Sequence, residues 1–156
     1  MGTNLSISAW HKRFLTALRR LAFVGPTLAR LTVGLVFLQT GWGKIHDLPH
    51  TIDYFTELHI PFPAFQAHLV SCTELIGGAA MLLGLGTRLV AVPLSITMVV
   101  AILTAKRSAL DGLPALVGFE EWSYLVFFVW LALAGAGPLS LDHLIARRLE
   151  RTAPIE

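Results

Sequence analysis

The sequence predicts an all-α integral membrane protein: an up-and-down bundle of four helices, preceded by an amphipathic helix at the membrane interface. Hydrophobic residues make up 54% of the 156 residues and charged residues only 14%, whereas soluble domains carry roughly 25% charged residues. Apolar segments of spanning length recur four times, and stretches such as "LIGGAAMLLGLG" lack the alternation of a barrel strand. Helices satisfy their own backbone groups in lipid, so a helical bundle is the expected architecture.

Four segments are candidate membrane spans, each about 16–20 residues long. At about 1.5 Å per residue they cover roughly 24–30 Å, which is close to the hydrocarbon thickness of a bilayer. They are Leu28–Ile45, Gln66–Leu85, Leu89–Ala105 and Trp122–Gly137. We therefore expect a bundle domain over residues 26–146, an N-terminal segment over 1–25 and a cytoplasmic tail over 147–156.

Basic residues are distributed unevenly between the two ends of the predicted bundle. One end carries Lys12, Arg13, Arg19, Arg20, Arg30, Arg88, Arg147, Arg148 and Arg151, and the other carries Lys44, Lys106 and Arg107. The positive-inside rule then places both termini in the cytoplasm and predicts a multi-pass protein of a bacterial inner membrane. A net charge of +2 distributed in this way fits membrane topology, so we expect a lipid bilayer as partner and no nucleic acid.

The N-terminal stretch "SAWHKRFLTALRRLAFV" is interpreted as a helix in the inner headgroup layer. Trp10, Phe14, Ala17, Leu18 and Leu21 recur at helical spacing with basic residues between them. No short apolar core with a small-residue cleavage site is evident, so we do not expect a cleaved signal. A role in orienting the first span is favoured over a role in binding a partner.

The first span carries its polar and small residues on one face. Arg30, Gly34, Phe37, Gly41 and Lys44 follow one another at spacings of four, three, four and three, which confines them to a sector of about 80°. The second span repeats these spacings with Glu74, Gly78, Met81, Leu85 and Arg88. Small residues let helix backbones approach closely, so these faces are expected to pack on each other or around a narrow cleft.

Antiparallel packing of the two faces would bring Lys44 near Glu74, which lies too deep to reach the headgroups. One interpretation is a pair that only fixes helix register, with Arg30 and Arg88 anchoring the cytoplasmic interface. The other is functional, because ionisable groups inside membranes often mark proton or ligand paths.

Three stretches resemble the DoxX family of small bacterial membrane proteins: "RLTVGLVFLQTGWGKI", "ELIGGAAMLLGLGTRLVA" and "GAGPLSLDHL". The resemblance runs from about Leu28 to Ala146. Pro138 and Leu139 depart from it, since many relatives carry a basic and an aromatic residue there. The family pattern falls on Arg30, Gly34, Gly41, Lys44, Glu74, Gly77, Gly84, Arg88, Gly135, Gly137, Ser140 and Asp142.

The family is similar to the DoxD component of thiosulfate:quinone oxidoreductase, so the resemblance implies an oxidoreductase subunit linked to the quinone pool. The single Cys72 excludes a dithiol mechanism within one chain. Haem, iron–sulfur and dinucleotide motifs are not found in the sequence. A quinone remains possible as a cofactor, because its site needs only an apolar cleft with one or two polar groups.

Candidate site residues follow from that hypothesis. Glu74 and Lys44 are the candidate catalytic residues: Glu74 as a proton relay, and Lys44, or a histidine in its place, as a hydrogen-bond donor to the ring. Candidate ligand-binding residues are Arg30, Trp42, His46, Tyr54 and Glu74, with Trp42 or Tyr54 stacking on the ring. Trp122 and Tyr124 are favoured as residues of the interfacial aromatic belt.

The loop after the first span carries His46, His50, His59 and His68 among three carboxylates. "DYFTEL" is expected to form a short surface helix, and Pro49 argues against a regular helix joining His46 to His50. We favour a histidine-bearing cap over the bundle mouth and expect no metal, since neither thiolates nor a recognised ligand spacing is present.

Two classes of function remain open. The first is a quinone-linked redox subunit that works with a partner protein subunit or as a homo-oligomer. The second is a non-catalytic membrane accessory for assembly, anchoring or transport, in which the charged face only holds helices together. A channel or transporter has less support, because four short helices leave little lumen.

Overall fold

The computed structural model describes residues 10, 13–16 and 18–152 of the chain, and this part is all-helical, without strands. The helices are α2 (Val24–His46), α3 (Leu48–Glu57), α4 (Pro63–Leu83), α5 (Thr87–Thr104), α6 (Leu113–Gly118), α7 (Glu120–Ala134) and α8 (Leu141–Thr152). A 3-10 turn, Arg107–Ala109, lies between α5 and α6. The all-α prediction is confirmed.

The four longest helices contact one another in a cycle: α2 packs on α4, α4 on α5, α5 on α7 and α7 on α2. Their shared core consists of Val33, Phe37, Met81, Ala91, Leu94, Met98, Phe128 and Leu131. The Phe37 ring meets Phe128 edge-on at a centroid distance of 4.8 Å and Tyr124 at 5.5 Å. Tyr124, expected in the aromatic belt, therefore packs against the core.

The α2–α4 contact depends on glycines. A Cβ placed on Gly34 would lie 2.9 Å from the backbone N of Leu82, and one on Gly41 would overlap the backbone of Leu75. A Cβ on Gly78 would in turn overlap the backbone of Leu38. The two backbones approach so closely that no side chain fits between them at these positions, which confirms direct packing of α2 on the Glu74–Met81 part of the second predicted face. Leu85 and Arg88 do not belong to that face, because α4 ends at Leu83 and Arg88 lies on α5.

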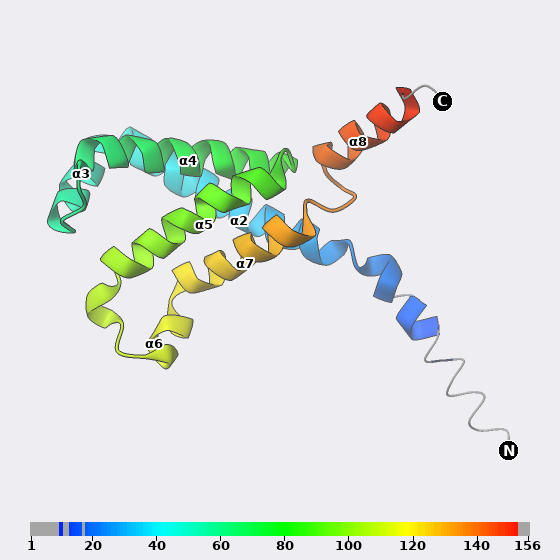
Figure 1. The fold of residues 1–156 in the computed structure, drawn as a ribbon, viewed down its shortest axis with the longest axis horizontal. Helices are drawn as coiled ribbons and strands as arrows, with labels where there is room; N and C mark the ends of the chain where they lie inside the picture. The colour runs from blue at the N-terminus through cyan, green and yellow to red at the C-terminus, as the bar shows by residue number, and fades with distance from the viewer. Residues whose placement is uncertain (1–9, 11–12, 17, 153–156) are drawn as a thin grey trace, which may run out of the picture.

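The two ends of the molecule differ in what covers them. Figure 1 shows α3 and α6 at one end, with α8 and the start of α2 at the other. The turn between α4 and α5 lies at the α8 end, where Gly84 and Gly86 adopt positive φ angles of 66° and 59°. Glycine takes up this left-handed conformation without steric cost, so α4 can reverse into α5 over three residues.

Two helical stretches are long and apolar enough to cross a membrane: residues 13–46 and α5. Helix α4 is long enough, with 21 residues, whereas α7 has 15. The predicted fourth span begins and ends too late in the sequence. The prediction was Trp122–Gly137, whereas helix α7 starts at Glu120 and ends at Ala134, because Gly135 leaves the helical region with a φ of 85°.

The N-terminal segment is helical at residues 13–16 and 18–21. Trp10 and Phe14 stack with ring centroids 5.5 Å apart, and both are exposed together with Leu18 and Leu21. Ala17, the remaining member of the predicted apolar face, lies outside the described residues. At the other terminus, α8 runs continuously through the predicted domain boundary at residue 146.

Replacing Gly41 by alanine is expected to lower the stability of the bundle by about 1–3 kcal/mol, because the added methyl group overlaps the backbone of α4. Gly43→Ala is the matched control, since a Cβ at Gly43 meets nothing within 4 Å. Thermal unfolding in detergent measures both. Equal melting temperatures for the two variants would contradict the close α2–α4 contact.

Candidate functional site

Lys44 and Glu74 form an ion pair between α2 and α4. Lys44 Nζ donates to Glu74 Oε1 at 2.5 Å, as expected from the helical spacing of the two polar faces. The Glu74 side chain is only 3% exposed, whereas that of Lys44 is 33% exposed. The Glu74 carboxylate is therefore covered by protein, while the lysine bound to it is partly accessible from outside.

Close helix packing explains why Glu74 is buried. A Cβ on Gly41 would lie 2.8 Å from the carbonyl carbon of Glu74, so α2 passes directly over this residue. Glu74 Oε2 is buried and accepts no hydrogen bond within the described chain. Leaving a buried acceptor unsatisfied costs about 1–3 kcal/mol, so this oxygen is the place where an added proton or a ligand donor would be stabilised.

Helix α3 holds the end of α2 that carries Lys44. Thr51 is buried, and its hydroxyl donates to Asp47 O at 3.0 Å and to Lys44 O at 3.4 Å. Asp47 caps α3 by accepting from His50 N at 3.4 Å. Pro49 occupies the first turn of α3, where its missing N–H costs nothing. The predicted short helix around "DYFTEL" is thus confirmed as the end of a ten-residue helix.

The aromatic candidates lie at the same end of the molecule as Lys44 but do not contact the ion pair. Trp42 and His46 contact each other, with ring centroids 4.2 Å apart and His46 Nδ1 3.0 Å from Trp42 O. Both are exposed, and each lies two residues from Lys44, about 200° around the helix. Tyr54 is 44% exposed on α3, beside Phe55. Among the predicted site residues, the structure therefore brings together two separate pairs, Lys44 with Glu74 and Trp42 with His46.

The loop histidines do not gather into a metal-ligand cluster. Within the described residues no group of three or more histidine, cysteine, aspartate or glutamate side chains could hold an ion. His50 is exposed on α3, His59 follows it with a φ of 55°, and His68 Nδ1 lies 2.7 Å from Ala64 O on α4.

Arg30 lies at the opposite end of α2, about 21 Å from Lys44 at the helical rise of about 1.5 Å per residue. It is 3% exposed, and its guanidinium donates to Leu139 O at 2.7 Å and to Ala136 O at 3.4 Å. Gly84 makes room for it, since any Cβ there would overlap Arg30 Nη1. The interpretation of Arg30 as an interfacial anchor is therefore wrong, because the segment after α7 covers it.

Asp142 completes this second polar cluster. Its carboxylate accepts from the backbone N–H groups of Gly86 at 2.7 Å and Thr87 at 3.1 Å, at the start of α5. Its own N–H donates to Gly84 O at 3.0 Å. Ser140 Oγ accepts from His143 N at 3.2 Å and so caps α8. The serine and aspartate of "PLSLDHL" carry the sequence signal of a helix start, although not of its contact with α5.

The fold and these two clusters define a class: small all-helical proteins with helices long and apolar enough to cross a membrane, in which two helices meet on glycine faces and share an ion pair. The model of the family described as DoxX matches residues 25–107, more than half of the chain. The chain belongs to the DoxX family.

Three relatives support this assignment. The chain is 33% identical over 124 residues to "Putative oxidoreductase CatD" of Bacillus subtilis (strain 168), covering 78% of this chain and 87% of the relative. It is 30% identical over 132 residues to the inner membrane protein YqjF of Escherichia coli (strain K12), covering 84% and 99%. A membrane protein of Mycobacterium tuberculosis (strain ATCC 25618 / H37Rv) is 37% identical over 131 residues, covering 76% and 80%. No solved structure matches the chain.

Replacing Lys44 by methionine is expected to destabilise the bundle, because Glu74 then stays buried without a counter-charge. The loss should fall below the about 3–5 kcal/mol seen when one member of a fully buried pair is removed, since Lys44 is 33% exposed. Adding Glu74→Met to Lys44→Met should recover much of that loss. Thermal unfolding of the single and double variants measures the coupling, and strictly additive effects would show that the pair does not act as a unit.

Replacing Asp142 by alanine is expected to cost about 1–2 kcal/mol, because two N–H groups at the start of α5 lose a charged acceptor. Asp53→Ala is the control, since Asp53 is exposed on α3 and accepts no hydrogen bond within the described chain. Denaturation in mild detergent compares the two. A control as destabilised as Asp142→Ala would rule out this capping role.

Proposed function

We propose that this protein is a quinone-linked subunit of a membrane oxidoreductase system, in which Lys44 and Glu74 deliver a proton to the quinone. The observation that supports the proposal most directly is that only one oxygen of the Glu74 carboxylate has a hydrogen-bond donor within the described chain. Glu74 is 3% exposed and keeps one oxygen without a partner, while its lysine remains 33% exposed. A purely structural pair would not need a route to the surface. The relative named as an oxidoreductase supports the same class of reaction.

The chemistry assigned to the pair is proton transfer coupled to electron transfer. Conversion of a quinone to a quinol takes up two electrons and two protons. The electrons would come from a reduced sulfur compound oxidised by a partner subunit, as the resemblance to thiosulfate:quinone oxidoreductase implies. Lys44 would donate a hydrogen bond to a ring carbonyl and then pass on the proton that it shares with Glu74. Protons from the aqueous phase would restore the pair and supply the second ring oxygen.

The position of the ring is constrained by the packing of α2 on α4. Because backbone meets backbone at Gly41 and Gly78, a quinone ring does not fit between the two helices there. It would approach from the exposed edge of Lys44, with its isoprenoid tail in the surrounding lipid. Tyr54 on α3 would bind the rim of the ring, while Trp42 and His46, on the other side of α2 from Lys44, would contact the tail.

In the membrane arrangement that we propose, α2, α4, α5 and α7 all cross the bilayer. The basic residues near Arg88 and α8 would then lie on the cytoplasmic side, with Lys44 and α3 outside. The exposed leucines of these helices, including Leu28, Leu89 and Leu133 at 59%, 80% and 76%, would face lipid or a second subunit. The relative named as an inner membrane protein supports this location.

A second function is supported by the same ion pair. If the chain is an accessory for assembly, anchoring or transport, Lys44 and Glu74 only fix the register of α2 on α4. The direct backbone contacts beside the pair favour this role, since they need one fixed register. The two functions differ in what Glu74→Gln does, because an amide can still hydrogen-bond Lys44 but cannot transfer the proton.

The experiment is quinone extraction from protein purified in mild detergent, followed by mass spectrometry. Wild type is expected to carry quinone, while Glu74→Gln and Lys44→Met, if folded, should retain at most about a tenth of it, the effect of losing about 1.4 kcal/mol of binding free energy. Glu57→Gln is the matched control, since Glu57 is an exposed carboxylate at the same end.

Absence of quinone from every sample would argue against the redox function. The accessory function would then predict that Glu74→Gln lowers the melting temperature or the recovery of a co-purifying subunit. Equal loss of quinone in Glu57→Gln would contradict a specific role for Glu74.

A further inference from the structure

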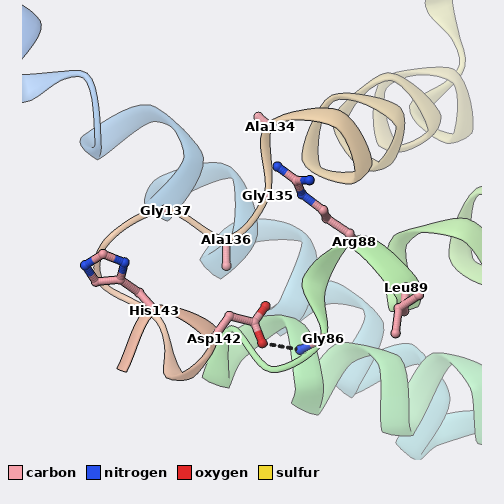
Figure 2. A pocket seen from close by; sticks show the side chains of 9 residues that line it. All are labelled: Gly86, Arg88, Leu89, Ala134, Gly135, Ala136, Gly137, Asp142 and His143. Carbon is pink, nitrogen blue, oxygen red and sulfur yellow. Dashed lines mark hydrogen bonds between the residues drawn. The ribbon is translucent and has the colours of Figure 1, made fainter. Parts of the chain in front are cut away.

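A pocket lies at the end of the molecule opposite Lys44, where α5 and α8 begin and α7 ends. It has a volume of about 400 Å³ and is lined by Gly86, Arg88, Leu89, Ala134, Gly135, Ala136, Gly137, Asp142 and His143. Figure 2 shows Arg88 reaching toward Gly135 and Asp142 toward Gly86. This volume is in the range of small-molecule sites, and the proposed redox reaction does not use it.

The pocket wall offers several hydrogen-bond donors that have no acceptor. Arg88 is exposed and makes no hydrogen bond or ion pair within the described chain, and its Nε lies 3.1 Å from the position of a Cβ on Gly135. His143 Nε2 is buried and also has no partner among the described residues. The backbone N–H groups of Ala136 and Gly137 donate no hydrogen bond to the described chain.

The single carboxylate in the pocket is already compensated. Asp142 accepts one N–H on each oxygen, from Gly86 and Thr87 at the positive end of α5. Arg30 lies behind it, bound to the same segment after α7. What remains unbalanced is the guanidinium of Arg88, so the pocket is suited to an anion.

Exposed apolar side chains lie beside the pocket. Leu89 on its rim is 80% exposed, and Leu139 and Leu144 nearby are 59% and 56% exposed. Helix α8 continues this surface with exposed Ile145 and Leu149 on the same side as Leu141. An anion that arrives with hydrocarbon attached would satisfy both the arginine and the leucines.

We propose that this pocket binds the phosphate of a phospholipid headgroup. Arg88 provides the charge, His143 Nε2–H and the free backbone N–H groups provide further donors, and the acyl chains lie along Leu89 and the apolar side of α8. Planar guanidinium groups bind phosphate oxygens with two parallel hydrogen bonds, which makes Arg88 the main determinant. The bound lipid joins the starts of α5 and α8 to the end of α7. Free phosphate has the same chemistry and is the other source to be tested.

Native mass spectrometry of the delipidated full chain in detergent tests this site. Phosphatidylglycerol is added to wild type, Arg88→Gln, His143→Ala and Arg107→Gln. Arg107→Gln is the matched control, because it removes the same charge from an exposed position at the opposite end. We expect Arg88→Gln to weaken binding about tenfold or more, corresponding to the loss of one charge-assisted contact, while the control binds like wild type.

Parallel titration with inorganic phosphate identifies the source of the ligand. A rise in melting temperature with phosphatidylglycerol alone, lost in Arg88→Gln and reduced in His143→Ala, supports the lipid. A rise with inorganic phosphate alone, lost in the same variants, keeps the anion site but overturns the lipid assignment. Equal binding by Arg88→Gln and Arg107→Gln, or no binding of either probe to wild type, overturns the proposal.

Discussion

The direct backbone contact between α2 and α4 is the constraint on which the rest of the structure depends. Gly34 and Gly41 on one helix and Gly78 on the other leave no side chain between the two chains. In lipid, hydrophobic burial gives little reason for helices to associate, so close packing and polar contacts must hold them together. This contact buries Glu74 beneath α2, and burial in turn obliges the carboxylate to keep Lys44 as its partner.

The two ends of α2 are fixed by different chemistry. At one end a charged side chain reaches a carboxylate, and a short helix clamps the backbone of Lys44 through Thr51. At the other end Arg30 binds only main-chain oxygens, which a neutral loop supplies. Beside this buried arginine, the exposed Arg88 makes no hydrogen bond or ion pair within the described chain. Proton chemistry is therefore assigned to the first end and anion binding to the second.

Residue spacing was sufficient to predict the pairing of Lys44 with Glu74, because both lie on glycine-bearing faces and antiparallel neighbours must align them. It was also sufficient for the all-helical class and for the surface helix α3. The role of Arg30 was not predictable, since it depends on how the segment 135–140 returns over the end of α2. The end of the fourth span was misplaced for a related reason. The predicted fourth span includes Gly135, but the φ of 85° at Gly135 ends α7 before it. The sequence analysis likewise did not predict that Trp42 and His46 would contact each other on the side of α2 that faces away from Lys44.

Redox-induced infrared difference spectroscopy tests the central claim most directly, with the wild type and each variant saturated by added quinone, so that weaker binding does not itself remove the signal. If the buried pair supplies the proton, reduction of the quinone should produce a carboxyl difference band that disappears in Glu74→Gln and persists in Glu57→Gln. A difference spectrum with no carboxyl band, or one unchanged by Glu74→Gln, would contradict the account and leave Lys44 and Glu74 as a structural link between α2 and α4.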